Sequence, residues 1–242
     1  MAFKVYTYPK FGDHCVAYGI VKEFAKQHEH IIMYTDACST ECRNTNKLLY
    51  SSLKNVTLSD ELYVEELHKK DWGIANTKIW FDTVEPWVKD LSLATPEWYN
   101  DYWKFDFQWY MNASVPFNLK WDNFFYERNI KKEKESYYDK FELKDDEEFI
   151  FMHEDVERNY IIKKEYINSN IRVINFSEFQ NVNILDILYT VERAKEIHTF
   201  NTGTLTFIDL MQIKHDKLFY HKYVRPGIFE QPILRLNWKI LQ

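Results

Sequence analysis

The chain has 242 residues, of which 45% are hydrophobic and 18% aromatic, and its formal net charge at neutral pH is −6. This length and composition are sufficient for a sizeable core, in either one large α/β domain or two small ones. The negative charge argues against a protein that coats nucleic acid, and we expect no nucleic-acid acceptor, although a local basic patch is not excluded.

No stretch is long and apolar enough to span a membrane, and the first residues lack the pattern of a secretion signal. We therefore expect a cytoplasmic protein with no membrane span. Three cysteines, Cys15, Cys38 and Cys42, cannot complete a disulfide framework, and we expect reduced, partly buried thiols. The spacing of Cys38 and Cys42 could place both on one helical face, but without matching His or Cys partners we predict no structural metal.

The first 34 residues predict a βαβ unit. Residues 3–8 mix β-branched and aromatic side chains and end at Pro9, which is typical of a strand, and residues 30–34 predict a second strand. Between them, apolar residues recur at four-residue spacing and predict a helix over residues 15–27. Ligands of such units bind where the loop leaves the carboxyl end of the first strand.

Gly12, Asp13 and His14 lie in that loop. Glycine allows a ligand to approach the backbone closely, the opening amides of the helix can bind an anion or polar group, and Asp13 and His14 add two proton acceptors. The alternative is structural, with Asp13 as a helix cap and His14 as a surface residue in the first helical turn.

The rest of the first half continues the alternation of strands and helices. The expected elements are a helix at 39–53 capped by Ser39 or Thr40, a strand at 55–58, a helix at 62–69, a strand near 72–75 and the end of the sheet near Ala94. Thr95, Pro96 and Glu97 then form a helix-opening signature. The ring-rich segment that follows, residues 98–111, indicates core packing or an interdomain seam, with a sugar-stacking platform as the alternative. A charged helix with a solvated face is expected at 131–141.

An acidic turn at residues 144–148 is the expected domain boundary, and the pattern restarts after it. Strands are predicted at 149–153, 171–175, 198–200 and 218–224, and helices over 184–194 and 205–211. The predicted domains are residues 1–145, which bind the acceptor, and residues 146–242, which bind the donor. His153 and Glu154 follow the first strand of the second half, with Arg158 close behind.

Asn201, Thr202, Gly203 and Thr204 precede the last predicted helix. Two threonine hydroxyls and the free amides at a helix amino terminus can bind a phosphate, whose charge the helix dipole favours. The alternative is a threonine-capped helix in which Gly203 serves a turn.

Together, the segments Phe11 to His14 and Asn201 to Ile208 resemble the pattern of heptosyltransferase-like glycosyltransferases of the type-B fold. Residues 103–153 also resemble short uncharacterised glycosyltransferase-like proteins of bacteria and viruses. The resemblance implies an α/β fold with two Rossmann-like domains facing a central cleft. The chain departs from the family in being short, in having Thr206 where a histidine is usual, and in lacking the family's phosphate-binding lysine by motif.

The resemblance further implies metal-independent transfer of a sugar from a nucleotide-sugar, a donor substrate that replaces any cofactor, to a glycan or glycoconjugate acceptor. Asp13 takes the position of the base, assisted by His14, and one direct displacement predicts inversion at the anomeric carbon. The remaining expected ligand-binding residues are Gly12, His153, Glu154, Arg158, Asn201, Thr202, Gly203 and Thr204, with Arg158 as the neutralising cation.

Two other classes of protein remain open. A Rossmann-type methyltransferase also binds its ligand at the first strand-helix turn and uses an acid after the second strand, where Asp36 lies, but it usually has a glycine-rich first loop. A non-catalytic sugar- or nucleotide-binding module would keep the cleft and the aromatic residues without needing a base.

Overall fold

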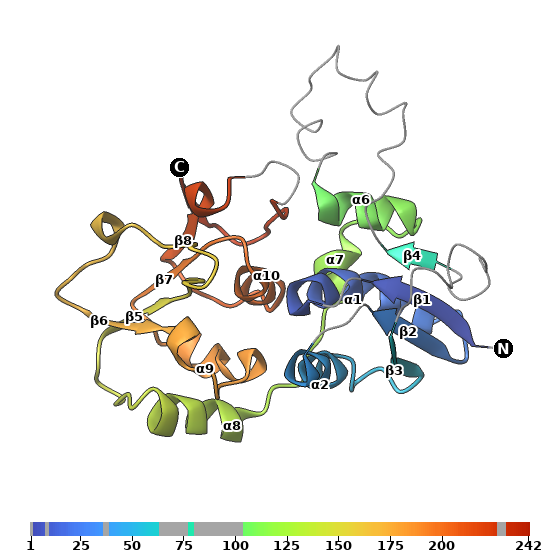
Figure 1. Ribbon diagram of the computed structural model, residues 1–242, viewed down its shortest axis with the longest axis horizontal. Helices are drawn as coiled ribbons and strands as arrows, with labels where there is room; N and C mark the ends of the chain where they lie inside the picture. The colour runs from blue at the N-terminus through green and yellow to red at the C-terminus, as the bar shows by residue number, and fades with distance from the viewer. Residues whose placement is uncertain (1, 8–9, 36–38, 63–76, 80–103, 227–230) are drawn as a thin grey trace, which may run out of the picture. The chain divides into compact units, whose positions relative to one another are not determined.

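The computed structural model describes residues 2–7, 10–35, 39–62, 77–79, 104–226 and 231–242 (Figure 1). The chain divides into two compact units. Unit 1 comprises residues 1–126 with 228–233, and unit 2 comprises residues 127–227 with 234–242. The division therefore falls earlier in the chain than the boundary expected after residue 145, and the assignment of acceptor and donor domains remains a prediction.

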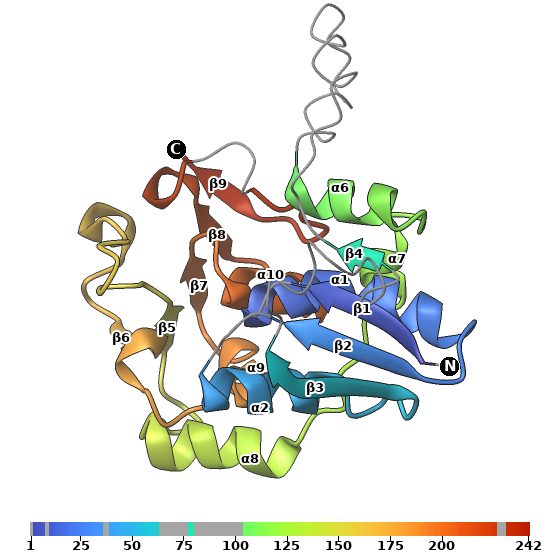
Figure 2. The ribbon, with the colours of Figure 1, turned by 45° about the vertical axis from the view of Figure 1, so that its right-hand side comes forward.

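The sheet of unit 1 is parallel, with the strand order β3-β2-β1-β4 (Figure 2). Its strands are β1 (Phe3–Thr7), β2 (Ile31–Thr35), β3 (Val56–Leu62) and β4 (Thr77–Ile79). The strands predicted at 3–8, 30–34 and 55–58 are thus confirmed. Of the helix predicted at 62–69, only Leu62 is described, and it ends β3. The predictions at 72–75, Ala94 and residues 95–103, as well as Asp36 and Cys38, lie outside the described residues.

The helices of unit 1 are α1 (Phe11–Ala25), α2 (Thr40–Leu49), α6 (Phe105–Asn112) and α7 (Leu119–Asp122). The predicted apolar stripe of α1 is buried, and so are His14, Cys15, Tyr18 and Gly19, because α1 contacts α2, α6 and α7 as well as β1. Ser39 caps α2 as one of the two predicted residues, its hydroxyl accepting a hydrogen bond from the Cys42 N–H at 3.2 Å.

The described part of the ring-rich segment packs in the core of unit 1. In α6, the side chains of Trp109 and Tyr110 are 2% and 0% exposed. The ring of Phe117 makes edge contacts with Phe107, Tyr110 and Trp121. For Trp109 and Tyr110, this burial supports core packing and argues against a platform for stacking sugars.

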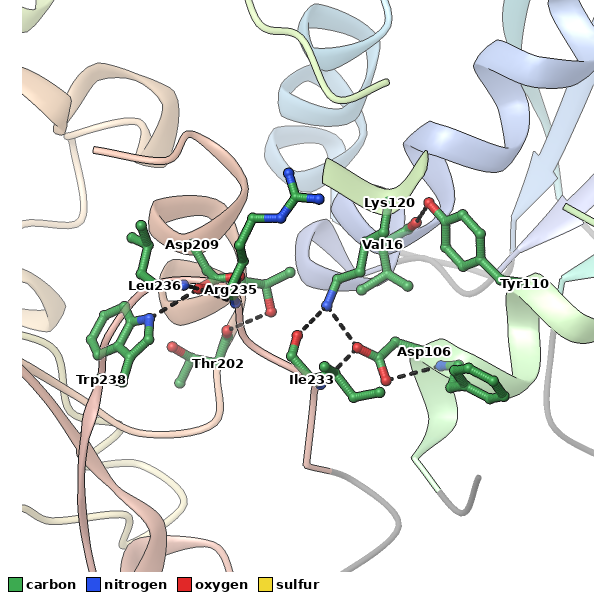
Figure 3. Close-up of polar contacts among 12 residues, drawn as sticks. Val16, Asp106, Tyr110, Lys120, Thr202, Asp209, Ile233, Arg235, Leu236 and Trp238 are labelled. Atoms are coloured by element: carbon green, nitrogen blue, oxygen red, sulfur yellow. Dashed lines mark hydrogen bonds and ion pairs between the residues drawn. The ribbon is translucent and has the colours of Figure 1, made fainter. Parts of the chain in front are cut away.

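Gly19 marks the closest approach of α1 to its neighbours. A Cβ atom at this position would lie 2.3 Å from the Tyr110 hydroxyl and 2.4 Å from the Leu119 carbonyl oxygen. The Tyr110 hydroxyl also donates a hydrogen bond of 3.0 Å to the Val16 carbonyl, so it cannot move without losing that bond (Figure 3).

Gly19→Ala should therefore destabilise the protein by about 1–3 kcal/mol, the usual effect of overpacking, despite the higher helix propensity of alanine. Urea unfolding of wild type and variant measures this difference. Gly12→Ala, in the first turn of the same helix, provides a comparison for the propensity effect. A Gly19→Ala protein as stable as the wild type would show that the three helices separate at little cost.

Unit 2 contains a second parallel sheet, with the order β6-β5-β7-β8-β9. Its strands are β5 (Phe149–Met152), β6 (Arg172–Asn175), β7 (Glu196–Thr199), β8 (Leu218–His221) and β9 (Lys239–Leu241). Four of these were predicted, whereas β9 was not. The α-helices are α8 (Ile130–Glu135), α9 (Leu188–Val191) and α10 (Gly203–Leu210); α8 continues as the π-helical turn η2 (Ser136–Lys140). Short 3-10 turns are η3 (Lys164–Tyr166), η4 (Phe176–Glu178), η5 (Ile184–Asp186) and η6 (Lys222–Val224).

The predicted charged helix has the expected solvated face, with one buried carboxylate on the other side. The side chain of Glu133 in α8 is fully buried, where it accepts hydrogen bonds from Arg128 and from the Tyr189 N–H. Arg128 also binds Glu192 in the turn after α9. One carboxylate of α8 thus connects this helix to α9.

The last residues of the chain are held by one buried carboxylate in each unit (Figure 3). In unit 1, Asp106 accepts hydrogen bonds from the Ile233 N–H at 2.8 Å and from the Lys120 ammonium at 2.6 Å, and Lys120 also donates to the Ile233 carbonyl at 2.6 Å. In unit 2, Asp209 accepts from the Arg235 and Leu236 N–H groups and from the Trp238 indole.

Candidate functional site

In each sheet, a ligand site is expected at the carboxyl ends of the strands where the strand order reverses. In unit 1 this point lies between β1 and β4, and α1 begins beside it. Helix α1 starts at Phe11, four residues before the predicted start, so Gly12, Asp13 and His14 lie in its first turns and not in a loop. Gly12 has no positive φ and needs no conformation reserved for glycine.

Asp13 is a partly exposed residue of the first turn of α1. The structural alternative for Asp13, that it caps the helix, is wrong, because Lys10 occupies the N-cap position and makes no side-chain capping bond. The positive end of the helix dipole stabilises a carboxylate at this place. Asp13 can therefore present an ionised carboxylate at the expected ligand edge of unit 1.

His14 is fully buried, contrary to both interpretations of the sequence. The Tyr50 hydroxyl donates a hydrogen bond of 3.0 Å to the His14 carbonyl, so the Nδ1–H of His14 donates to the Tyr50 oxygen at 3.3 Å. Burial lowers the pKa of the imidazole to about 3. The expected role of His14 as an assisting proton acceptor has no support in this geometry, which makes it a core residue.

The buried His14 predicts a specific dependence of stability on pH. Its pKa in the folded protein, about 3, lies below the value of about 6.5 in an unfolded chain, so between these values the unfolded state binds more protons. The free energy of unfolding should fall as the pH falls through this range, with a contribution from His14 of up to about 1.4 kcal/mol per pH unit.

Urea unfolding at pH 7, 6 and 5 measures this contribution as the difference in slope between the wild type and His14→Gln. The other titrating groups act in both proteins, so they cancel in that difference. Equal slopes would mean that the imidazole is protonated as readily in the folded protein as in the unfolded one.

In unit 2 the strand order reverses between β5 and β7, and two predicted segments meet there. His153 follows β5, while Asn201 and Thr202 follow β7. The His153 Nδ1 atom lies 3.4 Å from the Thr202 hydroxyl oxygen. Burial lowers the pKa of His153 to about 4, so its imidazole is neutral at neutral pH and can exchange a hydrogen bond with the hydroxyl.

Helix α10 starts two residues before the predicted start, so Gly203 and Thr204 lie in its first turn and not in a loop. The Thr202 hydroxyl caps the helix by accepting from the Leu205 N–H at 3.4 Å, and Gly203 is the first helical residue. This confirms the threonine-capped helix, but a cap satisfies only one of the four amides that a helix leaves unpaired at this end. No acidic residue lies in the first turn of α10, so nothing there opposes an anion.

Glu154 and Arg158 have structural partners. The Glu154 carboxylate is buried and accepts hydrogen bonds from the Ile162 N–H at 2.7 Å and from the Asn175 side chain at 3.1 Å. Arg158 forms an ion pair with Asp155, and its side chain is 60% exposed. These contacts fix the loop after β5, and they argue against Glu154 as a ligand contact and Arg158 as the neutralising cation.

Among residues 2–7, 10–35, 39–62, 77–79, 104–226 and 231–242, no group of three or more His, Cys, Asp or Glu side chains could hold a metal ion. Within the same ranges no helix is long and apolar enough to cross a membrane.

Neither a family model nor a curated protein sequence matches the chain. Among solved structures, the chain is similar to a protein described as a glycosyl transferase family 9 member from Veillonella parvula DSM 2008. The TM-score is 0.53 at 11% sequence identity, and the likeness covers 99% of this chain and 85% of that one. At this identity it supports the α/β fold with parallel sheets that was predicted.

Proposed function

We propose that the protein is a glycosyltransferase that moves a sugar from a nucleotide-sugar to a hydroxyl of a glycan or other glycoconjugate. The observation that carries the proposal is the meeting of His153, Thr202 and the amino terminus of α10 at the point where the strand order of unit 2 reverses. That arrangement offers amides and a hydroxyl to a phosphate. The fold likeness to a glycosyl transferase supports the same class of reaction.

In the proposed reaction, unit 2 binds the donor and unit 1 supplies the base, as in the two-domain, type-B arrangement that the sequence resembles. Asp13 accepts the proton of the acceptor hydroxyl as its oxygen attacks the anomeric carbon. The bond from that carbon to the phosphate oxygen breaks, and the nucleoside diphosphate leaves with the electron pair. The amides of Gly203 and Thr204 stabilise its negative charge, and a single displacement inverts the anomeric centre.

A binding assay separates this proposal from the other classes. A ligand at one hundred times its dissociation constant stabilises a folded protein by about 2.7 kcal/mol, which thermal unfolding detects readily. We expect stabilisation by at least one nucleoside diphosphate and its nucleotide-sugar. Stabilisation by S-adenosylmethionine alone would support a methyltransferase instead.

An activity assay then tests the chemistry and the role of metal. With a cell-derived glycan mixture as acceptor, we expect the donor that binds to release its nucleoside diphosphate, and to do so equally in EDTA, because helix amides take the place of a metal ion. Loss of turnover in EDTA, restored by manganese or magnesium, would contradict the metal-independent mechanism. Binding without turnover under any condition would favour a non-catalytic module.

A further inference from the structure

Three buried hydroxyls of unit 2 lack hydrogen-bond partners among the described residues. One belongs to Thr190 in α9, and the other two are the Tyr220 hydroxyl in β8 and the Thr204 hydroxyl in the first turn of α10, on side chains that are 3% and 0% exposed. Leaving such a group unpaired is costly, and most buried polar groups in folded proteins have a partner. The two hydroxyls therefore mark a place where a polar ligand would be stabilised.

Both hydroxyls belong to the end of the sheet where α10 begins. Tyr220 is the register partner of Thr199 in the parallel pair β7 and β8, so their side chains share one face of the sheet. The Thr199 hydroxyl lies 3.4 Å from the hydroxyl of Thr202, which caps α10, and Thr204 follows two residues later. Both unpaired hydroxyls therefore belong to residues at the edge of the sheet where α10 begins.

Arg225 adds a positive charge at the same edge. It follows the carboxyl end of β8 and the turn η6, and it is half-buried. Burial raises the pKa of Tyr220, while the Arg225 charge lowers it. The carboxyl end of β8 lies next to that of β7. A group bound at the amino terminus of α10 would therefore lie at the same edge of the sheet as Arg225.

The turn that carries Arg225 is held by a chain of directed hydrogen bonds. The Lys163 N–H donates to the Tyr223 hydroxyl at 2.8 Å, and that hydroxyl donates to His221 Nδ1 at 3.1 Å. His221 Nε2 donates to His198 Nδ1 at 2.9 Å, and His198 Nε2 donates to the Glu196 carboxylate at 3.3 Å. Burial lowers the pKa of both histidines, to about 3 for His221, which keeps them neutral as this chain requires. The Tyr223 hydroxyl therefore connects η6 to Lys163 on one side and, through the two histidines, to β8 and β7 on the other.

We propose that Arg225, with the hydroxyls of Tyr220 and Thr204, binds the diphosphate of the donor, and that Arg225 supplies the positive charge for which the sequence offered only Arg158. This inference rests on the proposed function, since it places more of the same donor site. Guanidinium groups suit the task because their planar array of N–H groups matches phosphate oxygens.

Calorimetry with the uridine, guanosine, adenosine, cytidine and thymidine diphosphates tests the assignment. For the nucleotide that binds the wild type, Arg225→Gln should weaken binding roughly tenfold to a hundredfold, the usual effect of losing a charged hydrogen bond. Binding of the corresponding nucleoside should be unchanged. Arg225→Lys should recover part of the affinity, because it keeps the charge without the planar geometry.

Tyr220→Phe and Arg193→Gln complete the design. Tyr220→Phe should weaken the diphosphate severalfold without lowering the melting temperature of the free protein, because its hydroxyl has no partner to lose among the described residues. Arg193 is exposed and precedes β7 at the opposite, amino-terminal edge of the sheet, so Arg193→Gln should bind like the wild type. Diphosphate affinity unchanged in Arg225→Gln but lost in Arg158→Gln would overturn the assignment while leaving the proposed function intact. A wild-type protein that binds none of the five diphosphates would overturn both.

Discussion

Asp13→Asn should turn over at least about a hundredfold more slowly than the wild type, the usual contribution of a general base. The amide has nearly the size of the carboxylate but cannot accept a proton at neutral pH, so the acceptor hydroxyl would attack without assistance. Asp13 lies in the first turn of α1, at the carboxyl edge of the sheet of unit 1. Donor binding, which we assign to unit 2, should be unchanged.

Steady-state kinetics with the identified donor, together with calorimetry, separate these two effects. Asp13→Glu is the matched control, since it keeps a proton acceptor and should retain more activity than the amide. An Asp13→Asn enzyme with near wild-type turnover would show that Asp13 is not the general base. His14 could not replace it without exposing an imidazole that is now fully buried.

The second large effect concerns stability. Asp106→Ala should destabilise the protein by about 3–5 kcal/mol, because it leaves the ammonium group of Lys120 buried without its counter-ion. Both side chains are fully buried, and the same carboxylate also accepts the Ile233 N–H (Figure 3). The variant therefore loses both the ion pair and the hydrogen bond from Ile233.

A double-mutant cycle with Lys120→Met isolates the interaction between the two charges. Replacing both partners removes the unpaired charge, so the double variant should be more stable than Asp106→Ala alone. Urea unfolding gives all four free energies. If the two single effects simply add, the pair contributes no coupling, and the buried contact is only a packing interaction.

Much of the fold could be predicted because its strands have local signals. Apolar, β-branched and aromatic runs placed β1, β2, β5 and β6 within a residue or two of their bounds. The early start of α1 was missed because Lys10 gives no capping signal. Strand β9 was missed because Lys239, Ile240 and Leu241 form a run too short to stand out, and it is a strand only through pairing with β8.

In the candidate site too, contacts between residues close in sequence could be predicted, whereas contacts between distant residues could not. The cap of Thr202 on α10 depends on residues three apart, so the sequence offered it as one of two interpretations. By contrast, Glu154 accepts a hydrogen bond from Asn175, twenty-one residues away, and no local pattern reveals such a partner. The pairing of His198 with His221 was missed for the same reason, since each histidine lies within or at the end of an apolar strand.

The most direct test of the account is a crystal structure of the protein with the nucleoside diphosphate that binds it most tightly. We predict that the diphosphate lies at the amino terminus of α10, within hydrogen-bond distance of the Gly203 and Thr204 amides, with Arg225 against its oxygens. A nucleotide bound instead at the first turn of α1 would contradict the assignment of the donor to unit 2.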